Sequence, residues 1–260
     1  MWLESTVVVV VPAWDEAPRI GCVLQGIPSW VDAIVVVDDA SRDRTVEVAR
    51  AVGDERVQIV RHDLNRGVGA AIATGYKQAA TIARGPRDVF VVMAGDDQMD
   101  PRDLPFLVAP IARGDAEYVK GNRFHSWGVA RTMPAGRLFG GLVLSWATSR
   151  AIGVRVSDSQ CGYTAIAGEA CARLELDALW PRYGYPNDLL SQLTMRNMRV
   201  TEVPVRAVYG DEVSRLRSHH VPVVAALVLR AWLRRRIATP ASYERHIPGT
   251  ISSSRERSRL

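Results

Sequence analysis

With 260 residues, of which 47% are hydrophobic, the chain is long enough to bury a core and to form one α/β domain. Its net charge of +5 is concentrated at one end: residues 230–260 carry eight arginines and two glutamates, a sum of +6, whereas residues 1–229 sum to −1. A near-neutral folded part without a basic stripe argues against nucleic acid as the main partner.

Neither a leader nor a membrane-spanning segment is expected. The first five residues lack a basic start, and the apolar run of residues 7–11 has the length of a strand. No stretch reaches the roughly 18 to 20 apolar residues that a bilayer-spanning helix needs. The three cysteines, Cys22, Cys161 and Cys171, are odd in number and lack metal-ligand spacing. We therefore expect reduced thiols and a cytoplasmic location.

Strand and helix patterns alternate through the first third of the chain. An unbroken β-branched run leads to Pro12, which we expect to stop the first strand. Ser41 or Asp43 is placed to cap the second helix. Strands are expected at residues 6–11, 33–37, 57–60 and 89–93, with helices at about residues 20–26, 46–52 and 70–83. This alternation predicts a Rossmann-like, mostly parallel sheet flanked by helices, whose loops line one crevice.

An acidic loop follows the fourth expected strand. Residues 89–93 are typical of a strand buried on both faces, and they lead directly into Asp96, Asp97, Gln98 and Asp100. Mg²⁺ and Mn²⁺ prefer oxygen ligands and are usually held by one or two carboxylates together with substrate phosphates. This loop is therefore a candidate metal site, with a solvated acidic turn as the alternative.

Six segments, in this order, carry a resemblance to a known family. They are Val9-Val-Val-Pro-Ala-Trp-Asp-Glu16, Val37-Asp-Asp-Ala-Ser41, Asn65-Arg-Gly-Val-Gly-Ala-Ala71 with Gly75, Gly95-Asp-Asp-Gln-Met-Asp-Pro101, Gly121-Asn-Arg-Phe124 and Asp158-Ser-Gln-Cys-Gly-Tyr-Thr-Ala165. Together they resemble glycosyltransferase family 2, which has the GT-A fold, and most of all its polyprenyl-phosphate sugar synthases, such as the dolichol-phosphate mannose and glucose synthases. A nucleotide-binding sheet of another kind is the alternative. The resemblance implies a GT-A domain of residues 1–217.

The resemblance assigns a nucleotide-sugar donor to the loops after the first strands. Trp14 stands where a Tyr is usual, and either ring can pack on the base. Glu16 has the alternative role of a helix N-terminal charge that complements the macrodipole. The assigned residues are Pro12, Ala13, Trp14, Glu16 and Asp39 for the base and ribose, Arg66 and Gly67 beside the nucleotide, and Arg215 near the diphosphate. GDP-mannose, UDP-glucose and UDP-N-acetylglucosamine all fit this pattern.

The resemblance also makes Asp96 and Gln98 ligands of Mg²⁺ or Mn²⁺, and it places Asp96 among the donor-binding and catalytic residues. The family usually has another Asp two residues before Asp96, but this chain has Ala94 there. Asp97 is an additional carboxylate that can compensate or merely face the solvent. Losing one anionic ligand should weaken the site without abolishing it, because the donor diphosphate supplies charge of its own.

On the acceptor side, the resemblance implies that Arg123 and Arg137 bind a lipid phosphate. Arg123 matches the family's motif, and Arg137 matches its spacing. Arginine binds phosphate through planar, bidentate hydrogen bonds, although both residues could instead be surface charges. Gly141 replaces the family's phosphate-binding Ser. Asp158 lies in the segment that shapes the acceptor floor, and Asp188 falls where many members carry a general base. A helix cap or a buried structural Asp is the alternative for both.

The C-terminal part is expected to differ from the domain. Residues 218–238 combine apolar residues with a basic end and predict an amphipathic helix, and residues 239–260, rich in Ser and Arg, are expected to be disordered. The helix could lie in a membrane interface, with its arginines near anionic lipid. Packing on the domain or within a homo-oligomer is the alternative.

These observations predict a metal-dependent, inverting glycosyltransferase that moves a hexose from a nucleotide-diphosphate sugar to a polyprenyl phosphate, in the cytoplasm or at the cytoplasmic face of a membrane. The acceptor phosphate is anionic and needs no general base, whereas a hydroxyl acceptor requires a carboxylate, for which Asp188 is the candidate. Two alternatives stay open. One is the same fold acting on a soluble or secondary-metabolite hydroxyl, and the other is a non-catalytic sugar-nucleotide binding protein, which Ala94 makes conceivable.

Overall fold

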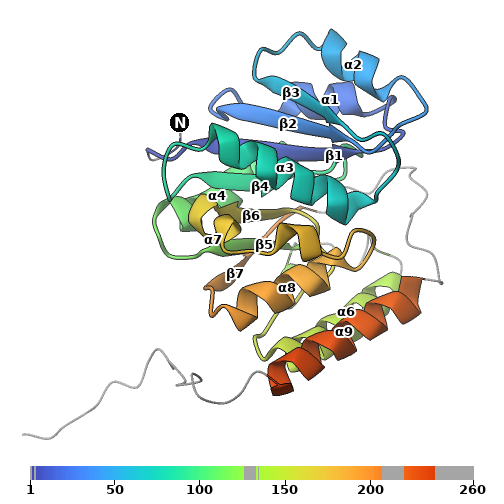
Figure 1. Ribbon diagram of the computed structural model, residues 1–260, viewed down its shortest axis with the longest axis vertical. Coiled ribbons are helices and arrows are strands. Elements are labelled where there is room, and N and C mark those ends of the chain that lie inside the picture. Colours follow the sequence, from blue (N-terminus) through green and yellow to red (C-terminus); the bar gives the residue numbers. More distant parts are fainter. Residues whose placement is uncertain (1, 3, 126–132, 134, 207–219, 238–260) are drawn as a thin grey trace, which may run out of the picture.

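The computed structural model describes residues 2, 4–125, 133, 135–206 and 220–237. The strands in this part are β1 (Val7–Ala13), β2 (Ala33–Asp38), β3 (Val57–Arg61), β4 (Val89–Val92), β5 (Tyr118–Asn122), β6 (Thr164–Ala167) and β7 (Val200–Pro204). They form one sheet in the order β3-β2-β1-β4-β6-β5-β7 (Figure 1). β1 to β4 pair in parallel, β6 runs antiparallel to β4 and β5, and β7 is parallel to β5. The expected mostly parallel sheet is confirmed.

Helices connect the strands and cover the sheet. They are α1 (Ile20–Gly26), α2 (Thr45–Ala51), α3 (Val68–Ile82), α4 (Leu104–Ala112), α6 (Ala135–Ile152), α7 (Gly168–Ala172), α8 (Tyr185–Met195) and α9 (His220–Ile237), with short 3-10 turns η1 (Pro101–Asp103), η2 (Arg123–His125) and η3 (Leu176–Ala178). α6 and α9 lie side by side, next to α8, at the end of the molecule farthest from β3 (Figure 1). None of the helices described here is both long and apolar enough to cross a bilayer.

The central strands consist of continuous apolar runs because both faces of the sheet are covered. Residues 7–11 of β1 are fully buried, as are almost all of β2 and β4, whereas β3 at the edge is only partly buried. Gly75 lets α3 pack closely on β1, since a Cβ there would lie 2.1 Å from Val10 Cγ1. The parallel pairing of β1 with β2 and β4 brings the carboxyl ends of these strands to one edge of the sheet.

One strand boundary differs from the expectation. Pro12 does not stop β1, which continues to Ala13 in register with Val37 and Asp38 of β2. Although Pro12 has no N–H, its carbonyl oxygen accepts a hydrogen bond from Gly95 N at 3.2 Å. The residue therefore still joins the first strand to the loop after β4.

Candidate active site

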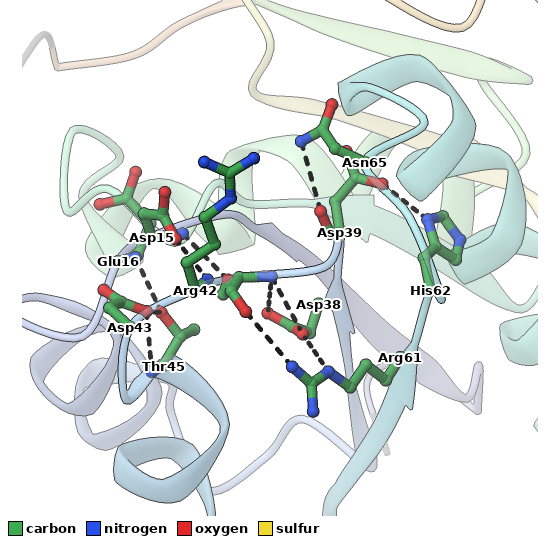
Figure 2. Close-up of polar contacts among 11 residues, drawn as sticks. Asp15, Glu16, Asp38, Asp39, Arg42, Asp43, Thr45, Arg61, His62 and Asn65 are labelled. Atoms are coloured by element: carbon green, nitrogen blue, oxygen red, sulfur yellow. Dashed lines mark hydrogen bonds and ion pairs between the residues drawn. The ribbon is translucent and has the colours of Figure 1, made fainter.

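The loops after β1 and β2 are joined by hydrogen bonds at the carboxyl edge of the sheet (Figure 2). Asp15 N donates to Ser41 Oγ at 2.9 Å, and Glu16 N donates to Thr45 Oγ1 at 2.8 Å. Asp43 accepts from Thr45 N at 3.0 Å in the first turn of α2. Neither expected capping residue is the N-cap of α2: Arg44 holds that position without a side-chain cap hydrogen bond, while Asp43 binds Thr45 N just before the helix and Ser41 holds the first loop.

The residues assigned to the base and ribose lie in or next to these two loops. Pro12 and Ala13 are buried at the end of β1, and Glu16 is buried one turn further on. Trp14 is 38% exposed, which leaves its ring accessible to a ligand. Ala13 O accepts from Asp39 N at 2.9 Å, so the two strand ends are in direct contact.

Asp39 organises the loop of residues 65–69, which we call the donor loop. Its buried carboxylate accepts hydrogen bonds from Arg66 N at 2.9 Å and from Gly67 N at 2.7 Å. His62 Nδ1 lies 2.7 Å from Asp39 Oδ1 (Figure 2). On its other side, His62 Nε2 lies 2.9 Å from Thr74 Oγ1. Gly67 has a φ of 98°, a left-handed conformation that favours glycine. Asp39 thus shapes the donor loop, and its assignment to the ribose stays a prediction.

Arg66 is exposed at the side of the donor loop. A hollow of about 310 Å³ opens there, lined by Arg61, His62, Asp63, Leu64 and Arg66. Arg61 is itself held by Asp38, with Nε and Oδ2 3.1 Å apart (Figure 2). Two arginines therefore line this hollow, and Arg66 stands two residues before α3, whose N-terminal N–H groups and helix dipole also favour negative charge.

The acidic loop lies at the carboxyl end of β4, in contact with Pro12 through the Gly95 N–H. Asp96 and Gln98 are adjacent and both partly buried, with Gln98 N donating to Asp96 Oδ1 at 3.2 Å. The structure therefore brings the two expected metal ligands to the same edge of the sheet as Pro12 and Asp39, as the strand pattern predicted.

The donor set of this loop is small. In the described part of the chain, no group of three or more His, Cys, Asp or Glu side chains could hold a metal ion. Asp97 has a φ of 62° and is exposed, and Asp100 caps η1 and pairs with Arg102 Nη2 at 2.6 Å. Asp96 and Gln98 thus supply one carboxylate and one amide oxygen. This pair fits Mg²⁺ or Mn²⁺ when donor phosphates provide further ligands.

A buried ion pair lies at the carboxyl end of β5. Arg123 donates from Nε to Asp158 Oδ2 at 2.7 Å and from Nη2 to Oδ1 at 2.9 Å, while the two side chains are 20% and 1% exposed. Burial alone raises the pKa of Asp158, but hydrogen bonding and charge pairing with Arg123, helped by Lys120, outweigh it and hold the pKa below its usual value. Arg123 is therefore a preoriented arginine rather than a loose surface charge.

Two further buried groups support this pair. Lys120 in β5 is fully buried, donates from Nζ to Cys161 O, and has a pKa lowered by that burial. Tyr163, expected at the acceptor floor, donates from its hydroxyl to Asp100 O at 3.0 Å. The segment that holds Arg123 is thereby joined to the loop that carries Asp96.

The structure does not describe the side chains of Arg137 and Arg215, but it does explain Gly141. Arg137 lies near the start of α6, but its side chain, like the whole of Arg215, falls outside the described part of the structure. Both roles stay predictions. At Gly141 a Cβ would lie 2.9 Å from Phe124 Cζ, so the Phe124 ring occupies the space that a Ser side chain would need.

Asp188 has the surroundings of a buried structural carboxylate. It lies in the first turn of α8 and is 1% exposed. Trp180 N donates to its Oδ2 at 2.9 Å, and its Oδ1 pairs with Arg230 and, at 3.2 Å, with Arg234 of α9. A general base must come within hydrogen-bond reach of the substrate proton. This geometry favours the structural alternative over the general-base role.

Sequence reasoning missed two of these connections. His62 has no role in the motifs read from the sequence, yet it bridges Asp39 and α3. Its position just after β3, beside the strand that ends in Asp38 and Asp39, is the signal that could have indicated this contact. The pairing of Arg230 and Arg234 with Asp188 spans more than 40 residues and has no local signal.

Comparisons with known proteins agree with this fold. The family model described as Glycosyl transferase family 2 matches residues 8–163. The chain is 28% identical to UDP-N-acetylglucosamine–dolichyl-phosphate N-acetylglucosaminyltransferase of Methanococcus voltae, covering 80% of this chain and 88% of that protein. It is 27% identical to the undecaprenyl-phosphate mannosyltransferase of Micrococcus luteus, covering 78% and 83%. A similar fold is found in glucosyl-3-phosphoglycerate synthase of Mycobacterium tuberculosis, which was solved with Mn²⁺, UDP and phosphoglyceric acid. The TM-score is 0.66 and the sequence identity is 21%, and the match covers 89% of this chain and 78% of that chain.

Proposed function

Because the chain belongs to glycosyltransferase family 2, we propose that it transfers a hexose from a nucleotide-diphosphate sugar to a polyprenyl phosphate. The names of two relatives, which act on dolichyl phosphate and undecaprenyl phosphate, support a lipid-linked acceptor. The observation that carries the proposal is an exposed apolar surface on α6 and α9, which a soluble acceptor does not require.

This surface consists of two stripes at helical spacing on neighbouring helices. Its residues are each 40% to 77% exposed, and they are Phe139, Leu142, Val143 and Trp146 of α6 and Leu229, Trp232, Leu233 and Ile237 of α9. Exposed apolar patches of this kind mark protein or membrane contacts. Amphipathic helices with Trp and Leu on one side and Arg at the edge are typical of helices that lie in a membrane interface.

The charges around the apolar surface favour an anionic membrane over a second copy of the chain. The Arg150 guanidinium carbon lies 5.8 Å from the centre of the Trp146 ring, and that of Arg236 lies 5.1 Å from the centre of the Trp232 ring. A hollow of about 380 Å³ between the ends of α6 and α9 is lined by Trp146, Ser149, Arg150, Gly153, Val154, Arg155 and Arg235. Its three arginines suit lipid phosphates, whereas two copies of this surface would bring like charges together.

The proposed reaction is a single displacement that inverts the anomeric carbon. Arg123, oriented by Asp158, binds the acceptor phosphate. That phosphate supplies an anionic oxygen as the nucleophile, so no general base is needed, in agreement with the burial of Asp188. Asp96 and Gln98 are the residues that would hold Mg²⁺ or Mn²⁺, which supplies positive charge against the departing nucleoside diphosphate.

A panel of donors and acceptors tests this function. The full-length protein is incubated with labelled GDP-mannose, UDP-glucose or UDP-N-acetylglucosamine, with Mg²⁺ or Mn²⁺, and with either a polyprenyl phosphate or 3-phosphoglycerate. We expect label to enter the organic phase only with the polyprenyl phosphate. Product with the soluble acceptor alone would support the alternative acceptor class. Nucleotide binding without any product would support a non-catalytic binding protein.

Membrane binding gives a second expected result. The double variant Trp146→Glu/Trp232→Glu should bind vesicles containing anionic phosphatidylglycerol at least about tenfold more weakly than wild type, because two apolar side chains of roughly 1.5 to 3 kcal/mol each no longer leave water. Phe106→Glu is the matched control, since Phe106 is 53% exposed on α4, away from this surface. Co-sedimentation equal to wild type would contradict membrane docking, and loss of a dimer in light scattering would identify the surface as an interface between copies.

A further inference from the structure

Asp188 joins the start of α8 to the residues just before it and to the distant helix α9. Its carboxylate binds Trp180 N on one oxygen and Arg230 and Arg234 of α9 on the other. Burying a carboxylate is costly unless it is paired and hydrogen-bonded, and here both conditions are met by groups outside its own helix. The contacts therefore hold α9 and the segment of residues 180–184, which we call the bridge loop, to the start of α8.

The bridge loop in turn lies directly against the donor loop. Ala70 N donates to Pro181 O at 3.1 Å. A Cβ on Gly69 would lie 2.2 Å from Trp180 O, and a Cβ on Gly67 would lie 2.5 Å from Pro181 O. These are contacts between backbones, which have no side-chain rotamers to absorb a displacement. A shift of the bridge loop must therefore move the donor loop or open a gap beside it.

A second contact joins α9 to the same loop. Gly184, the last residue of the bridge loop, has a φ of 99°, and a Cβ there would lie 2.6 Å from Leu227 Cδ1 of α9. On the opposite side, the donor loop is held by Asp39 through Arg66 N and Gly67 N. The donor loop is thus held by both Asp39 and the bridge loop. α9 contacts the bridge loop directly at Gly184 and, through Asp188, at Trp180.

We propose that Asp188 is a positioning residue that couples the seating of α9 to the binding of the donor nucleotide. The inference rests on the proposed function, because it takes the donor loop to contact a nucleoside diphosphate. Since coupling is reciprocal, a correctly seated α9 raises nucleotide affinity, and bound nucleotide stabilises α9 in its seat. The helix that carries half of the apolar surface is then linked to the donor side of the crevice.

Nucleotide affinity of the full-length chain tests the coupling without any turnover. Calorimetry with GDP and with UDP in the presence of Mn²⁺ should show a Kd about five- to tenfold higher for Asp188→Asn and for Arg230→Gln/Arg234→Gln than for wild type. Arg236→Gln is the matched control: it removes the same charge from the same helix, but Arg236 lies over Trp232 and has no contact with Asp188. Its Kd should equal that of wild type.

Hydrogen exchange supplies a readout that a purely structural role would not change. Peptides from residues 220–237 should become more protected from exchange when nucleotide is added to wild type, and this gain in protection should be lost in Arg234→Gln. That variant keeps the pairing of Arg230 with Asp188, so it can be used if Asp188→Asn does not fold. An unchanged nucleotide Kd in folded Asp188 variants would overturn the inference. If kcat also fell strongly while that Kd stayed unchanged, the result would instead support Asp188 as the general base. If wild type binds neither nucleotide, the proposed function fails first, and the inference with it.

Discussion

Replacing Asp96 by alanine is expected to lower kcat/KM on the order of 100-fold or more, the largest effect we expect from a single side chain. Asp96 and Gln98 are the two expected metal ligands, and Ala94 has already removed the carboxylate that the family usually adds. Asp96 thus supplies the only negative charge of that pair. Without it, the charge on the departing diphosphate is less well neutralised in the transition state. Steady-state kinetics at several Mn²⁺ concentrations measures the change.

Asp97→Asn is the control for this variant. Asp97 is exposed and has a φ of 62°, a conformation that Asn tolerates, so the substitution removes a neighbouring charge without straining the loop. Its activity should stay close to that of wild type. Equal losses in the two variants would mean that Asp97 compensates for Ala94. Full activity of Asp96→Ala would contradict a metal site at this loop.

Replacing Arg123 by alanine should have two separable effects. It removes the preoriented guanidinium, and kcat/KM for a lipid phosphate should fall on the order of 100-fold, mostly through KM. It also leaves Asp158 buried without its partner, and the free energy of unfolding should fall by about 3 to 5 kcal/mol. Kinetics and urea unfolding of the same preparation measure the two effects.

The double variant Arg123→Ala/Asp158→Asn separates them. Because it removes the unpaired buried charge, it should regain part of the stability lost by Arg123→Ala. Its activity should not recover, because the arginine that binds the acceptor is still absent. Recovery of activity together with stability would show that Arg123 acts only through folding, and the acceptor phosphate would then bind elsewhere.

Much of the fold follows from local pattern. The runs at residues 7–11, 33–37, 57–60 and 89–93 predicted β1 to β4 to within two residues, because a strand covered on both faces needs a continuous apolar run. The same pattern placed Asp39 and Asp96 at one edge of the sheet, since parallel strands end on the same side. The reversed direction of β6 was not predicted, because strand direction depends on how the chain returns to the sheet rather than on its periodicity.

The candidate site was predicted less evenly. The positions of Asp96, Gln98, Asp39 and Arg123 at strand ends could be predicted because each follows a strand or stands in a motif, and their roles in binding and catalysis stay predictions. Asp188 was assigned as a base on its place in the motif order, but its partners on α9 make it a structural carboxylate in this geometry.

By itself, the sequence determined which segments are buried, where the strands end and which oxygen and guanidinium groups arrive at those ends. The tertiary structure alone decided which of these groups are already engaged: Asp158 with Arg123, Asp39 with the donor loop, and Asp188 with α9. The physical reason is that periodicity records burial, a property of each residue in its own element. Pairing of buried charges depends on which elements meet, and those meetings join residues that are tens of positions apart.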